Sequence, residues 1–391
     1  MAALGRAWRA LLRPRGPRAE PGGRRGVRAL RRSPVRVLQP QSPAEPPPPA
    51  AERSAAAPGP RYEKAAPGDR RLGKVVTIAK SKKFRDNHGK VLLEGHRLIK
   101  DALAAGAVPQ TLFFSTVGHL KLLPEAEIKR ASLVKVKFED IKTWSDLVTP
   151  QGLLGIFSKP DPAKMSYPAA QLANSLPLLL ICDNIRDPGN LGTILRSAAG
   201  AGCEKVLLTK GCVDPWEPKV LRAGMGAHFR VPIIANLDWE SVPTNLPAGI
   251  QVCVADNNDP DAPAGSTPVP RGAGSAPASP KAPMKSSPKA APEHEDEEGA
   301  AIPELAAQHY CEDWAQAPVA VVIGGETHGL SPAALGLAAS TGGKRLLIPV
   351  VPGVDSLNSA IAAGILLFEA KRQLLRRHKQ EDGRQKLPVP G

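Results

Sequence analysis

Residues 178–182 read Leu-Leu-Leu-Ile-Cys, and residues 184–196 read Asn-Ile-Arg-Asp-Pro-Gly-Asn-Leu-Gly-Thr-Ile-Leu-Arg. A short apolar run, a polar turn and a helical pattern predict a buried strand that leads into a helix. Two later segments also follow apolar runs: residues 323–330, Ile-Gly-Gly-Glu-Thr-His-Gly-Leu, and residues 348–360, which contain Ile348-Pro349 and Ser356-Leu357-Asn358-Ser359-Ala360. Because open α/β sheets bind ligands at the carboxyl ends of their strands, we expect the three segments to form one site.

The chain around these segments alternates apolar runs with helical patterns. Further strands are predicted at residues 205–209, 229–234, 250–254, 319–323 and 345–349. A helix is predicted to start near Asn190, and a final amphipathic helix is predicted from Ser356 through Arg372. Apolar strands that alternate with helices are typical of a parallel sheet covered on both faces. The sequence therefore predicts an α/β domain over about residues 175–376.

A smaller α/β domain is predicted before it, over residues 74–160. Strands are expected at residues 111–114, 133–136 and 153–157, and a helix is expected around residues 98–103. Residues 61–100 hold twelve lysines and arginines against four acidic residues. A basic surface favours phosphate-rich partners because binding releases counterions. The alternative is that these charges form only a solvated surface.

Two proline-rich stretches are predicted to be disordered. Nine prolines lie between residues 40 and 67, and ten lie between residues 260 and 303. These stretches lack the apolar mass that would offset the entropy cost of folding. We therefore expect a linker at residues 41–73 and a looped-out insertion at about residues 256–303. Residues 377–391 are expected to form a basic tail.

The amino terminus has the composition of a targeting segment. Residues 1–39 contain eleven arginines and one acidic residue, Glu20. An Arg-rich, acid-poor, amphipathic start is typical of a mitochondrial transit peptide, which we expect at residues 1–40, with the mature chain in the mitochondrial matrix. The alternative is a basic arm that binds nucleic acid. No stretch is long and apolar enough to predict a membrane span.

Several other site classes are poorly matched by the sequence. The five cysteines are scattered without a Cys-x-x-Cys pair, and no His-Glu-x-x-His motif is present, so neither a disulfide framework nor a metal site is predicted. The glycines of residues 189–202 do not form Gly-x-Gly-x-x-Gly, and no Gly-x-x-x-x-Gly-Lys-Ser/Thr loop occurs. Gly-Gly-Glu after a strand does allow a ligand to lie against bare backbone, which suits an adenosine.

Taken together, the three segments resemble the signature motifs of the SpoU/TrmH family, within the SPOUT superfamily of RNA methyltransferases. The first motif is matched by Asn190, Gly192 and Arg196, and the second by Gly324, Glu326, Gly329 and Leu330. The third is matched by Ile348, Pro349, Ser356, Leu357 and Asn358. Residues 90–97 resemble the amino-terminal substrate-binding domain of many SpoU-type enzymes. The resemblance implies a trefoil knot in the carboxyl-terminal part, and a homodimer with its site near the subunit interface.

The resemblance also implies the cofactor and the residue roles. S-adenosylmethionine is expected beside five residues: Gly324, Gly325, Gly329, Ile348 and Leu357. The residues expected to act in catalysis are Asn190, Arg196, Glu326, Ser356 and Asn358. Because arginine stays protonated in proteins, we expect Arg196 to hold a substrate phosphate, with that phosphate or Glu326 accepting the proton. Ser356 is also a candidate cap for the last helix, and Arg186 and Lys219 are candidate phosphate contacts.

By this resemblance, the expected activity is methylation of a ribose 2′-hydroxyl in mitochondrial large-subunit ribosomal RNA, in support of ribosome assembly. The expected partners are ribosomal RNA and the pre-ribosomal large subunit, without a metal ion. One alternative is an assembly factor that binds RNA without catalysis, and the intact set of Asn190, Arg196, Glu326 and Asn358 argues against it. A second alternative keeps the chemistry but takes transfer RNA as the substrate.

Overall fold

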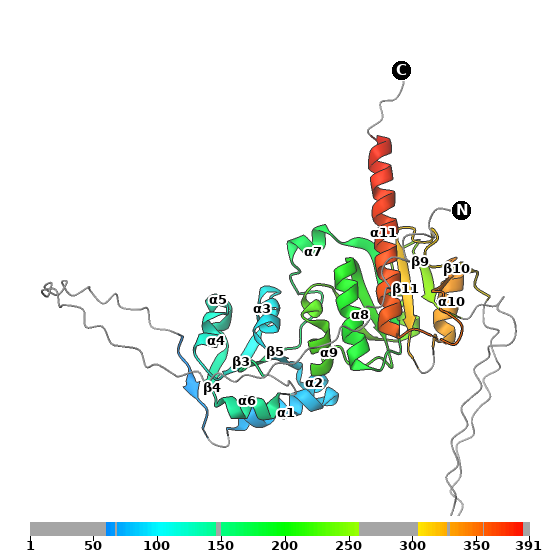
Figure 1. The fold of residues 1–391 in the computed structure, drawn as a ribbon. Helices are drawn as coiled ribbons and strands as arrows, with labels where there is room; N and C mark the ends of the chain where they lie inside the picture. Colours follow the sequence, from blue (N-terminus) through cyan, green and yellow to red (C-terminus); the bar gives the residue numbers. More distant parts are fainter. Residues whose placement is uncertain are drawn as a thin grey trace, which may run out of the picture. The chain divides into compact units, whose positions relative to one another are not determined.

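The computed structural model describes residues 60–66, 69–145, 150–257, 304–326, 329–354 and 356–385. The predicted transit peptide lies outside these residues, as do most of the predicted linker and insertion. Within the described ranges, no helix is both long enough and apolar enough to cross a membrane. This part of the chain folds into two α/β domains, a first domain from β1 to β5 and a second domain from α7 to α11 (Figure 1).

The first domain is built on a mixed five-stranded sheet in the order β1-β4-β3-β5-β2. The strands are β1 (Glu63–Lys64), β2 (Lys90–Glu94), β3 (Pro109–Phe114), β4 (Ser132–Lys135) and β5 (Leu153–Ser158). The helices are α1 (Arg70–Lys80), α2 (Lys82–His88), α3 (His96–Ala104), α4 (Gly118–Lys121), α5 (Glu125–Ile128) and α6 (Phe138–Trp144). Separate apolar clusters contain buried residues of this sheet. The three strands and the helix predicted here are confirmed.

The second domain has a parallel seven-stranded sheet in the order β10-β12-β9-β11-β6-β7-β8. The strands are β6 (Leu176–Asp183), β7 (Cys203–Thr209), β8 (Ile233–Leu237), β9 (Gln251–Ala255), β10 (Ala307–His309), β11 (Val319–Gly324) and β12 (Arg345–Leu347). The helices are α7 (Ala169–Ala173), α8 (Pro188–Ala201), α9 (Pro218–Gly224), α10 (Pro332–Ser340) and α11 (Ser359–Gln385), with short 3-10 turns η1 (Ala227–Phe229), η2 (Trp239–Ser241) and η3 (Pro243–Asn245). The predicted parallel-sheet α/β fold is confirmed.

Continuous apolar runs arise because both faces of this sheet are covered. Along β6, Leu178 and Leu180 pack in the same apolar cluster as α8 and α11, whereas Leu179 and Ile181 pack in the cluster that contains α10. Successive side chains of a strand point to opposite faces, so neither face of β6 can be polar. In Figure 1, α8 and α11 lie side by side over the sheet.

Three predicted boundaries are wrong. The folded chain begins before residue 73, because β1 pairs with β4 and α1 starts at Arg70. The apolar run at residues 229–234 is not one strand: Phe229 ends η1 and packs with the first domain, and β8 begins only at Ile233. The last helix starts at Ser359 and continues to Gln385, so residues 377–385 are helical.

The two domains are joined by a buried contact. The guanidinium of Arg85 on α2 forms an ion pair with Asp214 at 2.8 Å and also donates hydrogen bonds to the carbonyls of Ile78 and Ala79. Trp216, Leu221 and Phe229 of the second domain share an apolar cluster with the first. A buried ion pair depends on good geometry and further hydrogen bonds, and Arg85 has both. The first domain is therefore held firmly against the loop that precedes α9.

Candidate active site

The first segment places Asn190 at the start of α8. Asp183 ends β6, and Asn184 turns the chain with a φ of 56°. The side chain of Asp187 caps the helix by accepting a hydrogen bond from the Asn190 amide at 2.7 Å, and Pro188 occupies the first turn. A capping carboxylate followed by proline fixes where a helix begins. The side chain of Asn190 is thereby held at the carboxyl edge of the sheet.

The second segment passes directly over the first. Gly324 pairs with Asp183 across the sheet, and a Cβ on Gly325 would lie 2.5 Å from the carbonyl oxygen of Asn184. Only glycine allows this approach. Farther along, Gly329 has a φ of 64°, and its amide donates a hydrogen bond to the Gly325 carbonyl. The buried carboxylate of Asp183 accepts a hydrogen bond from the Ser331 amide at 2.7 Å. Asp183 therefore fixes both ends of this turn.

The third segment leads from β12 into α11. Asn358 caps the helix, because its side-chain oxygen accepts hydrogen bonds from the amides of Ala360 and Ile361 at 3.0 and 3.4 Å. The capping role predicted for Ser356 is therefore wrong, since the helix begins three residues later than expected. Ser331 caps α10 by accepting a hydrogen bond from the Ala334 amide.

Asn190, Glu326 and Asn358 meet in one hydrogen-bonded cluster, here called the Asn–Glu–Asn cluster. Oε1 of Glu326 accepts from the side-chain amides of Asn190 at 2.5 Å and Asn358 at 2.7 Å. The Asn358 amide also donates to Oδ1 of Asn190 at 3.0 Å. Each residue comes from a different segment, so the cluster ties the three segments together as predicted.

Two cavities meet at this cluster. The larger, of about 500 Å³, lies over the ends of β9, β11 and β12 and contains all five residues expected to contact the methyl donor: Gly324, Gly325, Gly329, Ile348 and Leu357. The smaller, of about 320 Å³, is lined by residues 184–188 and Asn190. Gly325, Glu326 and Ser359 line both cavities. The two cavities therefore adjoin and share a wall.

Ser359 is a site residue that sequence reasoning missed. It is the first residue of α11 and only 6% exposed, and its hydroxyl has no hydrogen-bond partner within the described residues. Ser359 lies in the third segment quoted above, but apolar spacing gives no sign that this serine faces a cavity. Ser356 lines the larger cavity as well.

Arg196 lies apart from the Asn–Glu–Asn cluster. It is exposed on α8, lines neither cavity, and makes no ion pair or hydrogen bond within the part of the chain that the structure describes. Arg186 lines the smaller cavity and donates to Oδ1 of Asn184 at 3.0 Å, whereas Lys219 is exposed on α9 and lines neither cavity. The structure brings together four of the five residues expected in catalysis and leaves out Arg196.

The cysteines are free thiols, and three of them are buried. Desolvation raises the pKa of the thiols of Cys182, Cys203 and Cys253, so these side chains stay protonated and act as small apolar groups. All five cysteines are free. Among the described residues, no group of three His, Cys, Asp or Glu side chains is arranged to hold a metal ion.

Comparison with known proteins identifies the family of this chain. Residues 177–368 match the SpoU rRNA Methylase family, and residues 74–155 match the MRM3-like substrate binding domain. The chain is 58% identical to "rRNA methyltransferase 3, mitochondrial" of Homo sapiens, with 92% of each chain covered. The chain belongs to the SpoU rRNA methylase family. The predicted family membership is confirmed.

Two solved methyltransferase structures are similar to most of this chain. The AdoMet-bound rRNA methyltransferase from Sinorhizobium meliloti is 25% identical, with a TM-score of 0.57, and covers 80% of this chain and 98% of its own. A second structure, described as an RNA 2′-O ribose methyltransferase, is 25% identical with a TM-score of 0.53 and covers 81% of this chain and all of its own. The trefoil knot expected for the SpoU fold stays a prediction.

Proposed function

We propose that this protein transfers the methyl group of S-adenosylmethionine to a ribose 2′-hydroxyl of mitochondrial large-subunit ribosomal RNA. The observation that carries the proposal is the Asn–Glu–Asn cluster, which stands between the larger and smaller cavities. A methyl transfer needs donor and acceptor held in line. Two adjoining cavities with a shared polar wall provide that arrangement.

The larger cavity fits the methyl donor. Its wall is bare backbone at Gly324 and Gly325 and apolar at Leu330, Ile348 and Leu357. Such a lining suits an adenine ring and ribose, which need shape and a few hydrogen bonds. When bound, S-adenosylmethionine supplies an electrophilic methyl group. The chain's own part is to hold the donor against the cluster and to exclude water from it.

The smaller cavity is assigned to the target nucleotide. Arg186 and the start of α8 lie on its wall, and a helix amino terminus favours a phosphate. The amides of Asn190 and Asn358 are fixed by Glu326, so they can orient the ribose without moving. Oε1 of Glu326 already accepts two hydrogen bonds. The 2′-hydroxyl proton then goes either to Oε2 of Glu326 or to the substrate phosphate, which the Arg196 guanidinium holds.

The position of Arg196 supports a homodimer. Ile361, Phe368 and Leu375 recur every seven residues on α11 and are 54%, 50% and 42% exposed. Gly200 on α8 faces Phe368, and Arg196 lies one helical turn before Gly200. An exposed apolar stripe of this kind marks an interaction surface. A second copy packed on this stripe would lie beside Arg196, and we assign Arg196 of each subunit to the smaller cavity of the other.

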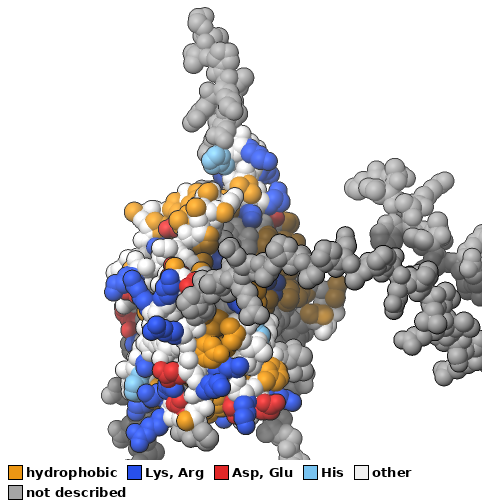
Figure 2. Space-filling model, turned by 90° about the vertical axis from the view of Figure 1, so that its left-hand side faces the viewer, with side chains coloured by type: hydrophobic (Ala, Val, Ile, Leu, Met, Phe, Trp, Pro, Cys, Tyr) orange, Lys and Arg blue, Asp and Glu red, His pale blue; other side chains and the backbone are white. Residues whose placement is uncertain are grey.

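The first domain, from β1 to β5, is assigned to substrate RNA. Figure 2 shows several groups of Lys and Arg side chains on the visible face, with carboxylates between them. Such a surface binds the RNA backbone without reading sequence. The human relative is named as mitochondrial, which supports a transit peptide at residues 1–40, a location in the matrix and a role in assembly of the large ribosomal subunit.

A transfer assay with purified protein tests the proposal. Incubation with methyl-labelled S-adenosylmethionine and large-subunit ribosomal RNA is expected to give a 2′-O-methylated nucleoside after nuclease digestion. The same RNA with a 2′-deoxy sugar at the acceptor should receive no label. Label on a base, or label only on transfer RNA, would contradict the proposal. Binding of the RNA without any transfer would favour the non-catalytic assembly factor.

A further inference from the structure

A third cavity, here called the interdomain pocket, lies outside the machinery described above. It has a volume of about 550 Å³ and lies over the ends of β7 and β8. Lys82 and Asp86 of α2 and the segment from Lys159 to Pro162 close its other side. Both domains therefore supply walls, and the buried Arg85–Asp214 ion pair keeps those walls together.

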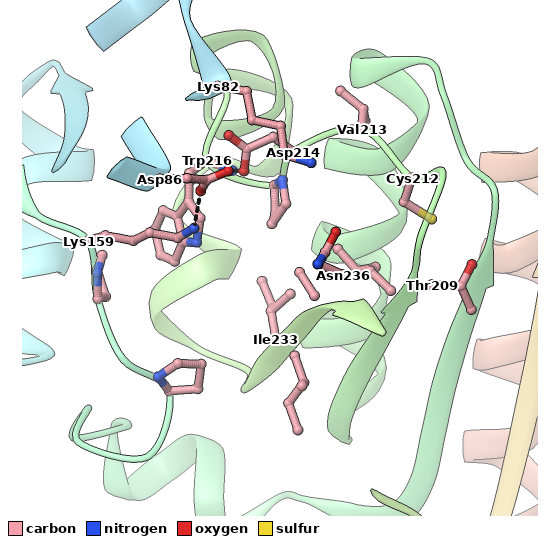
Figure 3. A pocket seen from close by; sticks show the side chains of 16 residues that line it. Lys82, Asp86, Lys159, Thr209, Cys212, Val213, Asp214, Trp216, Ile233 and Asn236 are labelled. Carbon is pink, nitrogen blue, oxygen red and sulfur yellow. Dashed lines mark hydrogen bonds and ion pairs between the residues drawn. The ribbon is translucent and has the colours of Figure 1, made fainter. Parts of the chain in front are cut away.

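The lining of the interdomain pocket suits a flat, largely apolar ligand with a polar edge. Val213, Ile233 and Ile234 give it an apolar surface, and Asn236 extends among them from the end of β8 (Figure 3). Asn236 is exposed, and its side chain makes no hydrogen bond within the described chain. A free amide offers both donors and an acceptor. A pocket that is mostly apolar with a few fixed polar groups is typical of a ligand site.

The backbone at Asn236 is also unusual. Its φ is 63°, and the pairing of β7 with β8 shifts register between Leu207 and Thr209, opposite this part of β8. Irregular strand pairing redirects side chains and is common next to functional sites. Here the irregular strand end turns the amide into the pocket rather than along the sheet.

The charges at the rim suit a phosphodiester. Lys82 is exposed and has no carboxylate partner within the part of the chain that the structure describes. Lys159 pairs with Asp86 at 2.7 Å, and both side chains remain partly exposed. An exposed ion pair of this kind contributes little energy, so Lys159 can turn to a phosphate at small cost. The site therefore combines an apolar floor, a polar amide and two cationic groups.

The interdomain pocket and the smaller cavity are separated by two adjacent backbone segments, at Ile185 and at Cys212–Val213. The Val213 amide donates to the Ile185 carbonyl at 2.9 Å, and the Ile185 amide donates to the Cys212 sulfur at 3.3 Å. Cys212 and Val213 line the interdomain pocket, and Ile185 lines the smaller cavity. An RNA strand whose target ribose occupies the smaller cavity can therefore place a nearby nucleotide in the interdomain pocket.

We propose that the interdomain pocket binds one unstacked nucleobase of the substrate RNA close in sequence to the methylated nucleotide. The inference rests on the proposed function and deepens it, because it makes this pocket a determinant of which nucleotide is chosen. Proteins recognise single-stranded RNA by splaying bases out and contacting their edges. Asn236 contacts the base edge, the apolar floor covers the ring, and Lys82 and Lys159 hold the adjoining phosphates.

An abasic scan of the substrate tests this inference. A short RNA that is methylated by the wild-type enzyme is synthesised with a single abasic nucleotide at each position around the target. With wild-type protein, one position is expected to lower kcat/KM about tenfold, the loss of roughly one base contact. Asn236→Gly removes the amide but tolerates the positive φ. It is expected to lower kcat/KM on the intact RNA by about the same factor and to lose sensitivity at that one position.

Two controls separate this inference from its alternatives. Lys83→Ala removes an exposed lysine of the same helix that does not line the pocket, and it should keep the abasic profile, whereas Lys82→Ala should raise KM for RNA severalfold. The dissociation constant for S-adenosylmethionine should be unchanged in all three variants. Identical abasic profiles for wild type and Asn236→Gly would overturn the inference while leaving the methylation itself intact. Absence of ribose methylation by the wild type would instead refute the proposed function.

Discussion

Arg196→Ala is expected to lower the methylation rate of ribosomal RNA on the order of 100-fold or more, the usual cost of removing one fixed charge-stabilising donor from an active site. Arg196 is exposed and lines neither cavity, so its removal should leave the fold and the larger cavity intact. The measurement is single-turnover transfer of labelled methyl groups at saturating S-adenosylmethionine, together with the dissociation constant of the methyl donor.

Arg196→Lys is the matched control for this prediction. It keeps the positive charge but loses the forked geometry that holds a phosphate at two points, so an intermediate rate is expected. A wild-type methylation rate in Arg196→Ala would show that Arg196 has no role in catalysis. A loss of donor binding equal to the loss of rate would show that Arg196 supports the larger cavity rather than the substrate phosphate.

Phe368→Asp is expected to give monomers and to lower the methylation rate by a similar factor. Phe368 is half-exposed at the middle of the stripe formed with Ile361 and Leu375. A carboxylate there cannot be buried against a second copy without a large desolvation penalty. Light scattering gives the mass, and the single-turnover assay gives the rate. Leu172→Asp is the control, because Leu172 is 59% exposed on α7 and lies outside the stripe.

A mixing experiment shows whether Arg196 acts in the other subunit. Arg196→Ala and Glu326→Ala should each be inactive alone, whereas subunit exchange between them should restore part of the wild-type activity. Recovery requires that one site of the mixed dimer receive an intact arginine from one chain and an intact Glu326 from the other. No recovery, with dimers present, would place Arg196 and Glu326 of the same subunit in one site.

The elements that sequence predicted best are those whose burial leaves a pattern. The core strands of the second sheet are apolar on both faces, so β6 and β11 were located within about two residues. The apolar run at residues 229–234 was wrongly predicted to be one strand, because Phe229 is buried for a different reason: it packs against the first domain. Periodicity reports that a residue is buried but not which surface buries it.

Sequence likewise predicted some features of the site and not others. The three segments were predicted to meet because each follows a recognisable strand end, and the family resemblance pointed to Asn190, Glu326 and Asn358 within them. The absence of Arg196 from that group was not predicted, since helix geometry places it on another face of α8. Nor could sequence indicate the interdomain pocket. Its walls come from α2, the segment after β5 and the ends of β7 and β8, which only the docking of two domains brings together.

The central claim is ribose methylation of mitochondrial large-subunit ribosomal RNA, and mapping of 2′-O-methyl groups at single-nucleotide resolution tests it most directly. The map is made in cells that lack the protein and in cells that regain either the wild type or Arg196→Ala. We predict that one 2′-O-methyl group is missing without the protein, returns with the wild type and does not return with Arg196→Ala. An unchanged methylation map in cells that lack the protein would contradict the account.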